Sequence, residues 1–494
     1  MLFRSMLKLL IGAPAFRAGM DLYFERCDGT AATVEDFLGC FAETSGRDLA
    51  DFKRWYNQAG TPLLTFRSVY DEAARRLTLD ISQETAPTRD QATKLPLTIP
   101  IALGLIDASG GEIALASSEA TPGELASGVL ELTGVSRRVT FTGVASRPTL
   151  SLLRGFSAPV RVDDDLTESD LLILSRHDRD SFNRWQAMQS LATRLLLRSV
   201  AAIRAGQAPK IDADFVEAYG AILGDAQAGR IDAAFAAQAL SLPSEGDIAR
   251  EMERNVDPDA IFAARDALRG ALGRAHAPAL GRLHDSFGGA AHFSPDAASA
   301  GRRALRNAAL MMLAAGKAEE GAQRAQRQLA GANNMTERFA ALAALSLTPG
   351  KAREQALEAF ARAHAADPLI LDKWFILQAQ IPEKETLLRV RGLMSHHAFS
   401  MSNPNRVRAL IGGFSANQTQ FNRIDGAGYD LLAEIVLTLD PTNPQIAARL
   451  LSALRSWRSL EPQRQSRAQA ALGAIAGKTE LSADVRDIVT RCLS

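Results

Sequence analysis

The seven histidines are the first residues to examine for chemistry, because imidazole is a common protein ligand of zinc. No two of them stand four residues apart with a glutamate beside the first, which is the helical arrangement in zinc peptidases. His276, His284 and His292 recur every eight residues, a spacing that on a helix rotates each side chain by about 80° from the last. The adjacent His396 and His397 would diverge by about 100°. The sequence therefore predicts no metal site and no catalytic residue in this chain.

Other sequence features exclude further classes of function. There is no Gly-x-Ser-x-Gly nucleophile turn and no Gly-x-x-x-x-Gly-Lys-Ser/Thr phosphate loop. The 56 basic and 56 acidic residues balance, so no overall field favours nucleic acid or an anionic membrane as a partner. No stretch approaches the roughly 18 apolar residues of a membrane-spanning helix. The three scattered cysteines cannot form a disulfide framework, which predicts a reducing compartment and a cytoplasmic location.

The first segment, residues 1–61, has the pattern of consecutive helices. Apolar residues at helical spacing in residues 1–11 predict an amphipathic helix rather than a signal peptide. Pro14 suits the first turn of the next helix. Thr33, with Asp36 three residues later, has the pattern of a capping box. This segment is too short to be a catalytic domain of its own.

The stretch Phe52–Pro62 marks the change from helix to strand. Asp48 is expected to be the N-cap of a helix that runs through this stretch. Gly60 followed by Pro62 is a typical helix stop. Beyond this point the period of apolar residues changes to two, as in residues 76–82. Short alternating strands separated by frequent turns predict a small β-sandwich over residues 62–162.

The third segment, residues 163–494, is predicted to be entirely helical. It opens with the acidic run Asp163–Asp165, which we interpret as a solvated linker because three adjacent carboxylates cannot converge on one cation. Asn403-Pro404 and Asn443-Pro444 each provide a cap and a proline first turn, 40 residues apart. That spacing is close to the length of HEAT-type helix pairs. The predicted fold is therefore mainly α, with a β-sandwich followed by a HEAT-like superhelix whose concave face is the usual binding surface.

A family resemblance is carried by seven short motifs spread along the chain. They are Tyr23-Phe24-Glu25-Arg26, Asp28-Gly29-Thr30, Trp55-x-x-Gln58-x-Gly60-x-Pro62, His177-x-x-Asp180-x-Phe182-x-Arg184-Trp185, Asn333-Asn334-Met335-Thr336, Asp372-Lys373-Trp374-Phe375 and Met401-Ser402-Asn403-Pro404-Asn405-Arg406. In this order they resemble the C-terminal part of zinc aminopeptidases of the aminopeptidase N family, bacterial alanyl aminopeptidase branch. Together they extend over nearly the whole chain.

The resemblance implies a function for a larger enzyme. Residues 1–61 would be the last helices of a thermolysin-like catalytic domain, residues 62–162 a spacer, and residues 163–494 the domain that caps the active site and helps to form the substrate chamber. The complete enzyme would bind zinc and remove N-terminal amino acids from peptides. The family's zinc motif, Gly-x-Met-Glu-Asn motif and catalytic tyrosine are absent from this sequence.

We therefore expect the chain to bind no zinc and to be inactive alone. Its expected partners are the N-terminal catalytic portion, peptide substrates in the complete enzyme, and further copies of itself through the residue 1–60 helices. The alternative is a non-catalytic helical-repeat scaffold that binds proteins and derives from the same family.

Two arginines are the candidate substrate-binding residues. In the resembled enzymes, arginines of the helical domain face the C-terminal side of the peptide, and Arg408 and Arg449 follow the two Asn-Pro caps at matching places. A guanidinium suits a carboxylate because it is permanently charged and can donate two parallel hydrogen bonds. A solvated or capping role is the alternative for both. Arg406 is not expected to line the chamber, and Trp374 and Phe375 are expected in the core.

Overall fold

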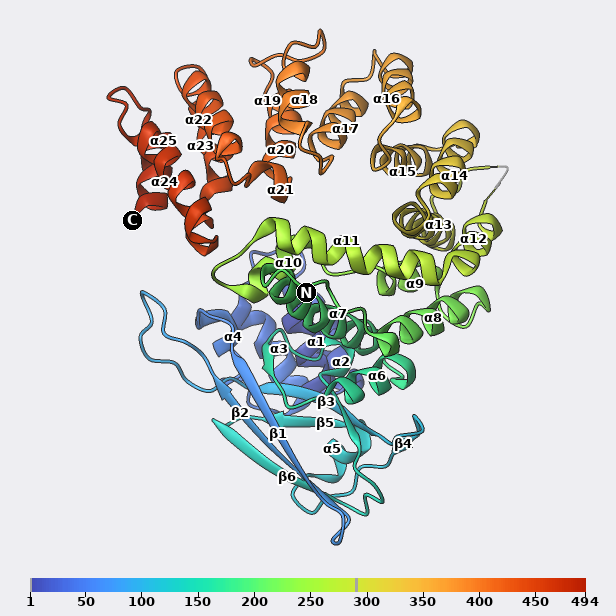
Figure 1. Cartoon of the computed structure of the whole chain (residues 1–494). Coiled ribbons are helices and arrows are strands. Elements are labelled where there is room, and N and C mark those ends of the chain that lie inside the picture. Colours follow the sequence, from blue (N-terminus) through green and yellow to red (C-terminus); the bar gives the residue numbers. More distant parts are fainter. Residues whose placement is uncertain (1, 289–291) are drawn as a thin grey trace. The chain divides into compact units, whose positions relative to one another are not determined.

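The computed structural model describes residues 2–288 and 292–494 and begins with a group of helices that follows the predicted pattern (Figure 1). These helices are α1 (Leu2–Ile11), α2 (Ala13–Cys27), α3 (Val34–Ser45) and α4 (Arg54–Asn57). Pro14 lies in the first turn of α2. The Thr33 hydroxyl accepts from the Asp36 backbone N–H at 3.1 Å, and the Asp36 carboxylate accepts from the Thr33 N–H at 2.9 Å. The predicted capping box is confirmed.

The helix expected from Asp48 to Gly60 is wrong in length. Asp48 accepts from the Ala50 N–H at 2.8 Å within a turn, and only the four residues of α4 are helical. The reason is tertiary. The Trp55 indole donates to the Thr98 carbonyl at 2.8 Å, and the Gln58 amide donates to the Leu95 carbonyl at 3.0 Å. These bonds hold the segment against the residues before a strand, and local helix propensity is too weak to compete.

Two sheets follow and form the predicted β-sandwich. Their strands are β1 (Leu63–Asp71), β2 (Arg76–Glu84), β3 (Ile99–Ile106), β4 (Glu112–Ile113), β5 (Val129–Leu132), β6 (Ser136–Thr142), β7 (Thr149–Leu152) and β8 (Arg161–Asp163), with the short helices α5 (Pro122–Ser127) and η1 (Arg154–Phe156) between them. One sheet has the order β6-β2-β1-β8, and the other has β3 between β4 and β5, with β7 also paired to β3. All these pairings are antiparallel except that of β1 with β8.

The acidic run is exposed, but it is not a free linker. Asp163 belongs to β8 and pairs with Thr65 of β1. Its carboxylate accepts from Arg67 at 2.6 Å, and the Asp165 carboxylate accepts from the Ser68 N–H at 2.7 Å. The interpretation as a solvated linker is therefore wrong, because the strand partners of these carboxylates are about 100 residues earlier in the chain and are not visible in the local pattern.

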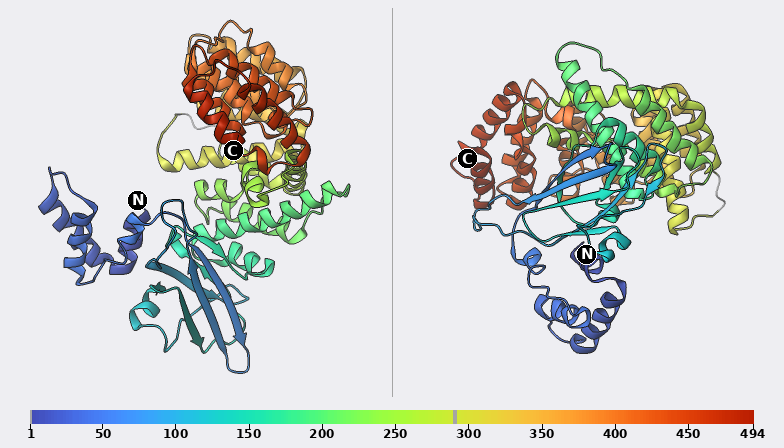
Figure 2. Two further views of the ribbon diagram at one scale, coloured as in Figure 1. Left: turned by 90° about the vertical axis from the view of Figure 1, so that its left-hand side faces the viewer. Right: turned by 90° about the horizontal axis from the view of Figure 1, so that it is seen from below.

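The residues of Met1–Leu191 form one compact unit with a continuous hydrophobic core. Leu7 of α1 and Phe41 of α3 are fully buried in the same cluster as Leu79 and Ile101 of the two sheets. Figure 2 shows the N-terminal helices to one side of the sandwich. The helices thus share their core with the sheets and depend on them for burial.

A buried carboxylate anchors the helix that leaves the sandwich. This helix is α6 (Glu168–His177), and it is followed by α7 (Ser181–Arg204). The Asp170 carboxylate accepts two hydrogen bonds from Arg147 at 2.8 and 2.9 Å, and one from the Thr149 hydroxyl at 3.0 Å. It also closes a capping box with Thr167. Burial raises the pKa of Asp170, but the hydrogen bonds from Arg147 and Thr167 outweigh it and hold the pKa at about 2.

The second compact unit, Ala192–Ser494, is helical throughout its described residues. After the end of α7, its helices are α8 (Ala213–Gln227), α9 (Ala233–Ala239), α10 (Glu245–Met252), α11 (Pro258–Ala275), α12 (Ala277–Ser286), α13 (Ala297–Gly316), α14 (Ala318–Gly331), α15 (Met335–Ser346), α16 (Lys351–Ala363), α17 (Pro368–Ala379), α18 (Thr386–Leu393), α19 (Pro404–Val407), η2 (Arg408–Gly412), α20 (Gly413–Ser415), α21 (Gln418–Phe421), α22 (Ala427–Leu439), α23 (Pro444–Leu451), η3 (Ser452–Leu454), η4 (Trp457–Ser459), α24 (Pro462–Ala476) and α25 (Ala483–Leu493).

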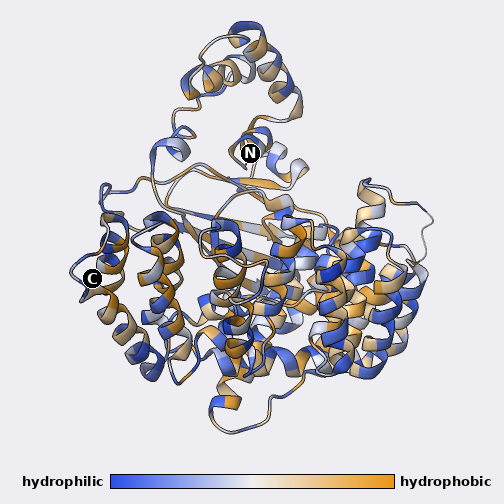
Figure 3. Cartoon of the chain, turned by 90° about the horizontal axis from the view of Figure 1, so that it is seen from above, coloured by the Kyte–Doolittle hydropathy of each residue, from blue (hydrophilic) through white to orange (hydrophobic). Residues whose placement is uncertain are grey.

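Successive helices of this unit pack side by side and curve into an arc, which confirms the predicted superhelix (Figure 1). Most of them mix hydrophilic and hydrophobic residues along their length, as amphipathic helices do (Figure 3). No helix in the described ranges is long and apolar enough to cross a membrane.

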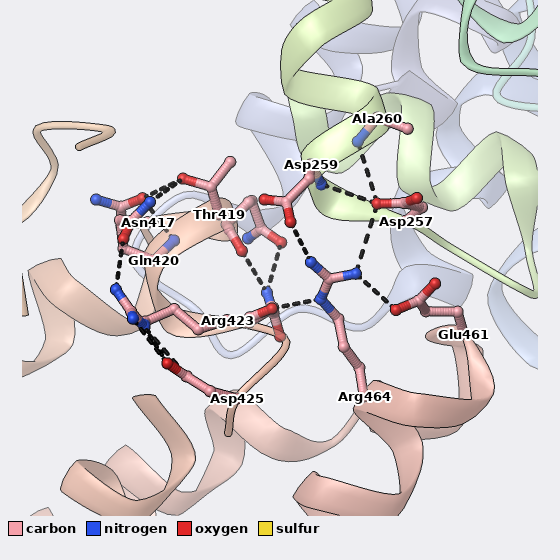
Figure 4. A network of polar contacts seen from close by, with 12 residues as sticks. Asp257, Asp259, Ala260, Asn417, Thr419, Gln420, Arg423, Asp425, Glu461 and Arg464 are labelled. Atoms are coloured by element: carbon pink, nitrogen blue, oxygen red, sulfur yellow. Dashed lines mark hydrogen bonds and ion pairs between the residues drawn. The ribbon is translucent and has the colours of Figure 1, made fainter. Parts of the chain in front are cut away.

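A buried arginine closes the arc on itself (Figure 4). Arg464 of α24 is 1% exposed and is the largest fully buried side chain among the described residues. Its guanidinium donates to Glu461 at 2.7 Å and also to Asp259, in the first turn of α11. Next to it, the Val256 N–H donates to the Ser459 carbonyl at 2.9 Å. Segments about 200 residues apart in the chain are thereby joined.

We predict that Arg464→Ala will strongly destabilise the protein. The change leaves Asp259, Glu461 and the Asn422 carbonyl without their cation, and breaking a buried ion pair typically costs about 3 to 5 kcal/mol. The free energy of unfolding in urea should fall by an amount near the lower limit, because Asp259 is partly exposed and can be hydrated. Arg491→Ala, which removes an exposed i,i+4 pair with Asp487, is the control and should cost less than about 1 kcal/mol. Equal effects of the two variants would contradict the prediction.

We predict that Asp170→Asn will destabilise the protein at neutral pH but not in acid. A carboxylate with a lowered folded pKa stabilises the fold at pH values above its unfolded pKa of about 3.9. That stabilisation is worth about 2 to 3 kcal/mol and is lost as the pH falls from about 4 through about 2. The difference in unfolding free energy between wild type and variant should therefore be constant above about pH 5 and shrink below pH 4. Asp21→Asn on the exposed surface of α2 is the control, and a pH-independent difference for Asp170→Asn would refute the assignment.

Candidate functional site

Arg408 lies where an Asn-Pro cap begins a short helix. The Asn403 side chain accepts from the Asn405 N–H at 3.0 Å and from the Arg406 N–H at 3.4 Å, as the sequence predicts for an N-cap. After one turn, α19 widens into the π-helical segment η2, which begins at Arg408. The Arg408 side chain is exposed and donates to the Asn405 side chain. Its remaining donors face no carboxylate within ion-pair distance among the described residues.

Arg449 occupies a comparable position on α23. Asn443 caps that helix by accepting from the Ile446 N–H at 3.2 Å. The Arg449 side chain is exposed and makes no hydrogen bond or ion pair with residues 2–288 or 292–494. Segment η2 packs against α23, so the two arginines lie on neighbouring elements. That both side chains line one concave face stays a prediction.

Arg406, two residues before Arg408, has a structural role. Its side chain is 6% exposed and forms an ion pair with Asp372. It also donates to the Ala398 carbonyl at 2.9 Å and to the Pro368 carbonyl at 2.7 Å. It therefore ties the loop before α19 to the start of α17. Its donors are used within the fold, in agreement with the expectation that it does not line the chamber.

The aromatic pair Trp374 and Phe375 lies in the core, as expected. Trp374 is 5% exposed and its indole donates to the Leu357 carbonyl at 2.9 Å, while Phe375 is fully buried. The His396 ring lies beside this pair, with its centroid 5.2 Å from that of Trp374, and the His397 ring lies 4.2 Å from the His396 ring. Burial and then the neighbouring His397 lower the pKa of His396, so a packed, neutral imidazole is favoured there.

The spaced histidines do not converge. His276 contacts the Val216 carbonyl at 2.9 Å and stacks on Tyr219. His284 is buried and its Nε2 contacts the Gln328 amide oxygen at 2.9 Å. His292 is exposed. In the described part of the chain no group of three or more His, Cys, Asp or Glu residues could hold a metal ion, so this donor set does not fit a zinc site.

A charged cleft in the helical unit was not predicted from the sequence. Arg265 and Arg269 of α11 line it together with Glu245 at the start of α10. Burial and the neighbouring Arg269 lower the pKa of Arg265, and burial raises the pKa of Glu245 against the opposing effect of both arginines. The only signal in the sequence is the spacing of four between the arginines, which places them on one helical face. Such pairs are common on solvated helices.

The chain matches two family models. Residues 60–165 match one described as "Domain of unknown function (DUF3458) Ig-like fold", and residues 168–494 match one described as "Domain of unknown function (DUF3458_C) ARM repeats". The immunoglobulin-like and repeat descriptions agree with the sandwich and the helical arc.

Known proteins match almost the whole chain. Aminopeptidase N of Caulobacter vibrioides is 42% identical over 491 residues and that of Escherichia coli is 37% identical over 490, each match covering 99% of this chain and 55% of the relative. A crystal structure of Legionella pneumophila aminopeptidase A in complex with aspartic acid superposes with a TM-score of 0.81 at 28% identity, over 99% of this chain and 55% of that one. The chain thus spans about half the length of these relatives. It belongs to the aminopeptidase N family and corresponds to the C-terminal part of its members.

Proposed function

We propose that this chain is the C-terminal portion of a zinc aminopeptidase that, when complete, removes N-terminal amino acids from peptides. The observation that carries the proposal is the match to aminopeptidases over 99% of the chain, in both sequence and fold. In this role the helical unit caps the active site and forms part of the wall of the substrate chamber. The proposed division is 1–61 for the end of the catalytic domain, 62–162 for the spacer and 163–494 for the cap.

In this proposal zinc is held by the N-terminal catalytic portion. The seven histidines of this chain are dispersed, and those that are buried are used in packing and hydrogen bonds. The chain's own contribution is therefore to bind and enclose the peptide. We also propose a cytoplasmic location, for which the three free cysteines are the support, and we propose neither nucleic acid nor membrane as a partner.

The N-terminal helices supply the proposed contact with the catalytic portion. Three large apolar side chains are exposed there: Leu9 at 39%, Phe24 at 56% and Val34 at 36%. Their burial against the catalytic portion would each contribute about 1 to 3 kcal/mol. Without that portion, the same apolar side chains would favour association between copies of the chain.

Arg408 and Arg449 are proposed to bind the C-terminal carboxylate of the peptide. Both guanidiniums are exposed and largely uncommitted within the described residues, whereas the buried Arg406 is fully engaged. An exposed arginine with spare donors can bind a ligand carboxylate without first breaking an internal pair. The second candidate function is a non-catalytic protein-binding scaffold, for which the arc of helical repeats is the support.

We predict that the chain alone will not hydrolyse alanyl or leucyl amides and will bind no stoichiometric zinc. Co-expression with the part of the Caulobacter relative outside the matched region should give a complex whose activity is abolished by a chelator. Co-purification, metal analysis and p-nitroanilide turnover measure these outcomes. Phe24→Asp should weaken the complex, while Val69→Asp, at a more exposed apolar residue of β1, should not. Turnover by the chain alone would refute the proposal, and failure to associate would favour the scaffold function.

We predict that Arg408→Ala and Arg449→Ala will impair cleavage of peptides more than cleavage of amino-acid amides. Each charge-assisted hydrogen bond to a carboxylate is worth about 1.5 to 3 kcal/mol, or about 10- to 100-fold in kcat/KM, and an amide substrate lacks that carboxylate. The measurement compares a tripeptide with alanyl p-nitroanilide in the reconstituted enzyme. Arg362→Ala, which removes an exposed arginine paired with Glu358, is the control. Equal losses on both substrates would leave the two arginines as structural residues.

A further inference from the structure

The charged cleft of the helical unit has two facing walls. One wall comes from the start of α10, with Glu245 and Gly246, and from α11, with Arg265 and Arg269. The opposite wall comes from the segment after α17 and from the turn before α21, and its polar members are Gln380, Asn417 and Gln418. Leu347 and Phe262 add apolar surface. Neither Arg408 nor Arg449 lines this cleft, so it is distinct from the candidate site above.

Most hydrogen-bond donors of the two arginines are uncommitted. Arg265 donates from Nε to the Pro243 carbonyl at 2.7 Å, and Arg269 donates from Nη2 to Asp266 at 2.9 Å. The Nε of Arg269 is buried and has no hydrogen-bond partner among the described residues. A buried donor without an acceptor costs free energy unless a ligand or water satisfies it.

One of the two cations that line the cleft has no paired carboxylate. Arg265 and Arg269 lie one helical turn apart, so their charges repel each other. Glu245 is the one acidic residue that lines the cleft among the described residues, and it forms no ion pair with either arginine there. Asp266, outside the lining, pairs with Arg269 at 2.9 Å, whereas Arg265 has no ion-pair partner among the described residues. The lowered pKa of Arg265, caused by burial and by Arg269, is consistent with a cation that lacks a paired carboxylate.

The opposite wall offers amide groups suited to a peptide. Asn417 uses its amide to hold the Ala379 and Ile381 carbonyls at 3.1 and 2.9 Å, which fixes the turn. The Gln380 and Gln418 side chains donate no hydrogen bond to other described residues. Their amides can therefore pair with the backbone groups of a chain that lies in the cleft.

We propose that this cleft binds a carboxylate, held by Arg265 and Arg269, either at the C terminus of a peptide or on a free small acid. A single negative charge matches the one unpaired cation, Arg265, whereas a phosphate dianion would bring a second charge and be repelled by Glu245. The planar guanidinium suits the two oxygens of a carboxylate. Binding would be a property of the chain itself, with or without peptidase activity.

The experiment is isothermal titration calorimetry of the full chain at low salt with four probes: N-acetyl-trialanine, its C-terminal amide, acetate and inorganic phosphate. The free acid should bind at least about tenfold more tightly than the amide, because a charge-assisted contact is worth one to two orders of magnitude. Acetate that binds as tightly as the peptide acid would identify a free small acid as the ligand source. Equal binding of acid and amide, or tighter binding of inorganic phosphate than of either carboxylate probe, would overturn the proposal.

Three variants test the residues. Each is made in a chain that also carries Arg408→Ala and Arg449→Ala, so that the proposed substrate site does not contribute. The double change Arg265→Gln and Arg269→Gln should then abolish the preference for the free acid, while Arg250→Gln, on the exposed surface of α10, should leave it unchanged. Glu245→Gln removes the opposing charge and should tighten binding of the free acid several-fold, a gain that a damaged fold could not produce. Circular dichroism checks the folding of each variant. An unchanged preference in the double variant, or weaker binding in folded Glu245→Gln, would refute the site.

Discussion

The closed arrangement of the helical unit depends on the contacts between one buried arginine and groups from distant segments of the chain. In an open solenoid each repeat contacts only its neighbours, and the two ends are free to move apart. Here the Arg464 guanidinium, 1% exposed, binds carboxylates on both α11 and its own helix, and it also binds the Asn422 carbonyl. Because guanidinium stays charged at all accessible pH values, the closure needs acceptors on every side. The structure supplies them from three separate segments, so opening the arc would break the contacts of Arg464 with α11.

This closure also sets the geometry of the charged cleft. Arg265 and Arg269 belong to α11, whose first turn binds Arg464, while the opposite wall is the turn at residues 416–418 before α21. That turn is continuous with Asn422, whose carbonyl accepts from Arg464. Figure 4 shows the guanidinium beside Asp257 and Asp259 of the α11 start, with Asn417, Thr419 and Gln420 in a neighbouring group next to Arg423. The same side chain therefore links the segments that are continuous with the two walls.

The sequence predicted features encoded within a few residues and missed those that depend on distant ones. The caps at Thr33, Asn403 and Asn443 were predictable because a short polar side chain meets an N–H three residues later. The periods of 2 and 3.6 likewise indicated the sandwich and the superhelix. The prediction of a long helix after Asp48 was wrong because Trp55 and Gln58 form hydrogen bonds with residues 95–98. The interpretation of the acidic run as a linker was wrong because Asp163 pairs with β1. The cleft could not be predicted, since its two walls are about 150 residues apart in the chain.

The degree of burial separates the roles of the arginines. Arg406 and Arg464 are almost fully buried, and they donate hydrogen bonds to carboxylates and backbone carbonyls. Substitution of either would therefore lower the free energy of unfolding. Arg408 and Arg449 are exposed, where an isolated charge adds little to stability and is free to meet a ligand. Arg265 and Arg269 lie between these cases: both are partly buried, Arg269 pairs with Asp266 but has an unpartnered Nε, and Arg265 has no ion-pair partner among the described residues. A partly desolvated cation without a partner binds an anion more strongly than an exposed one, because less water must be displaced and the local dielectric is lower. By this reasoning the cleft should discriminate between charged and neutral ligands more sharply than the two exposed arginines do.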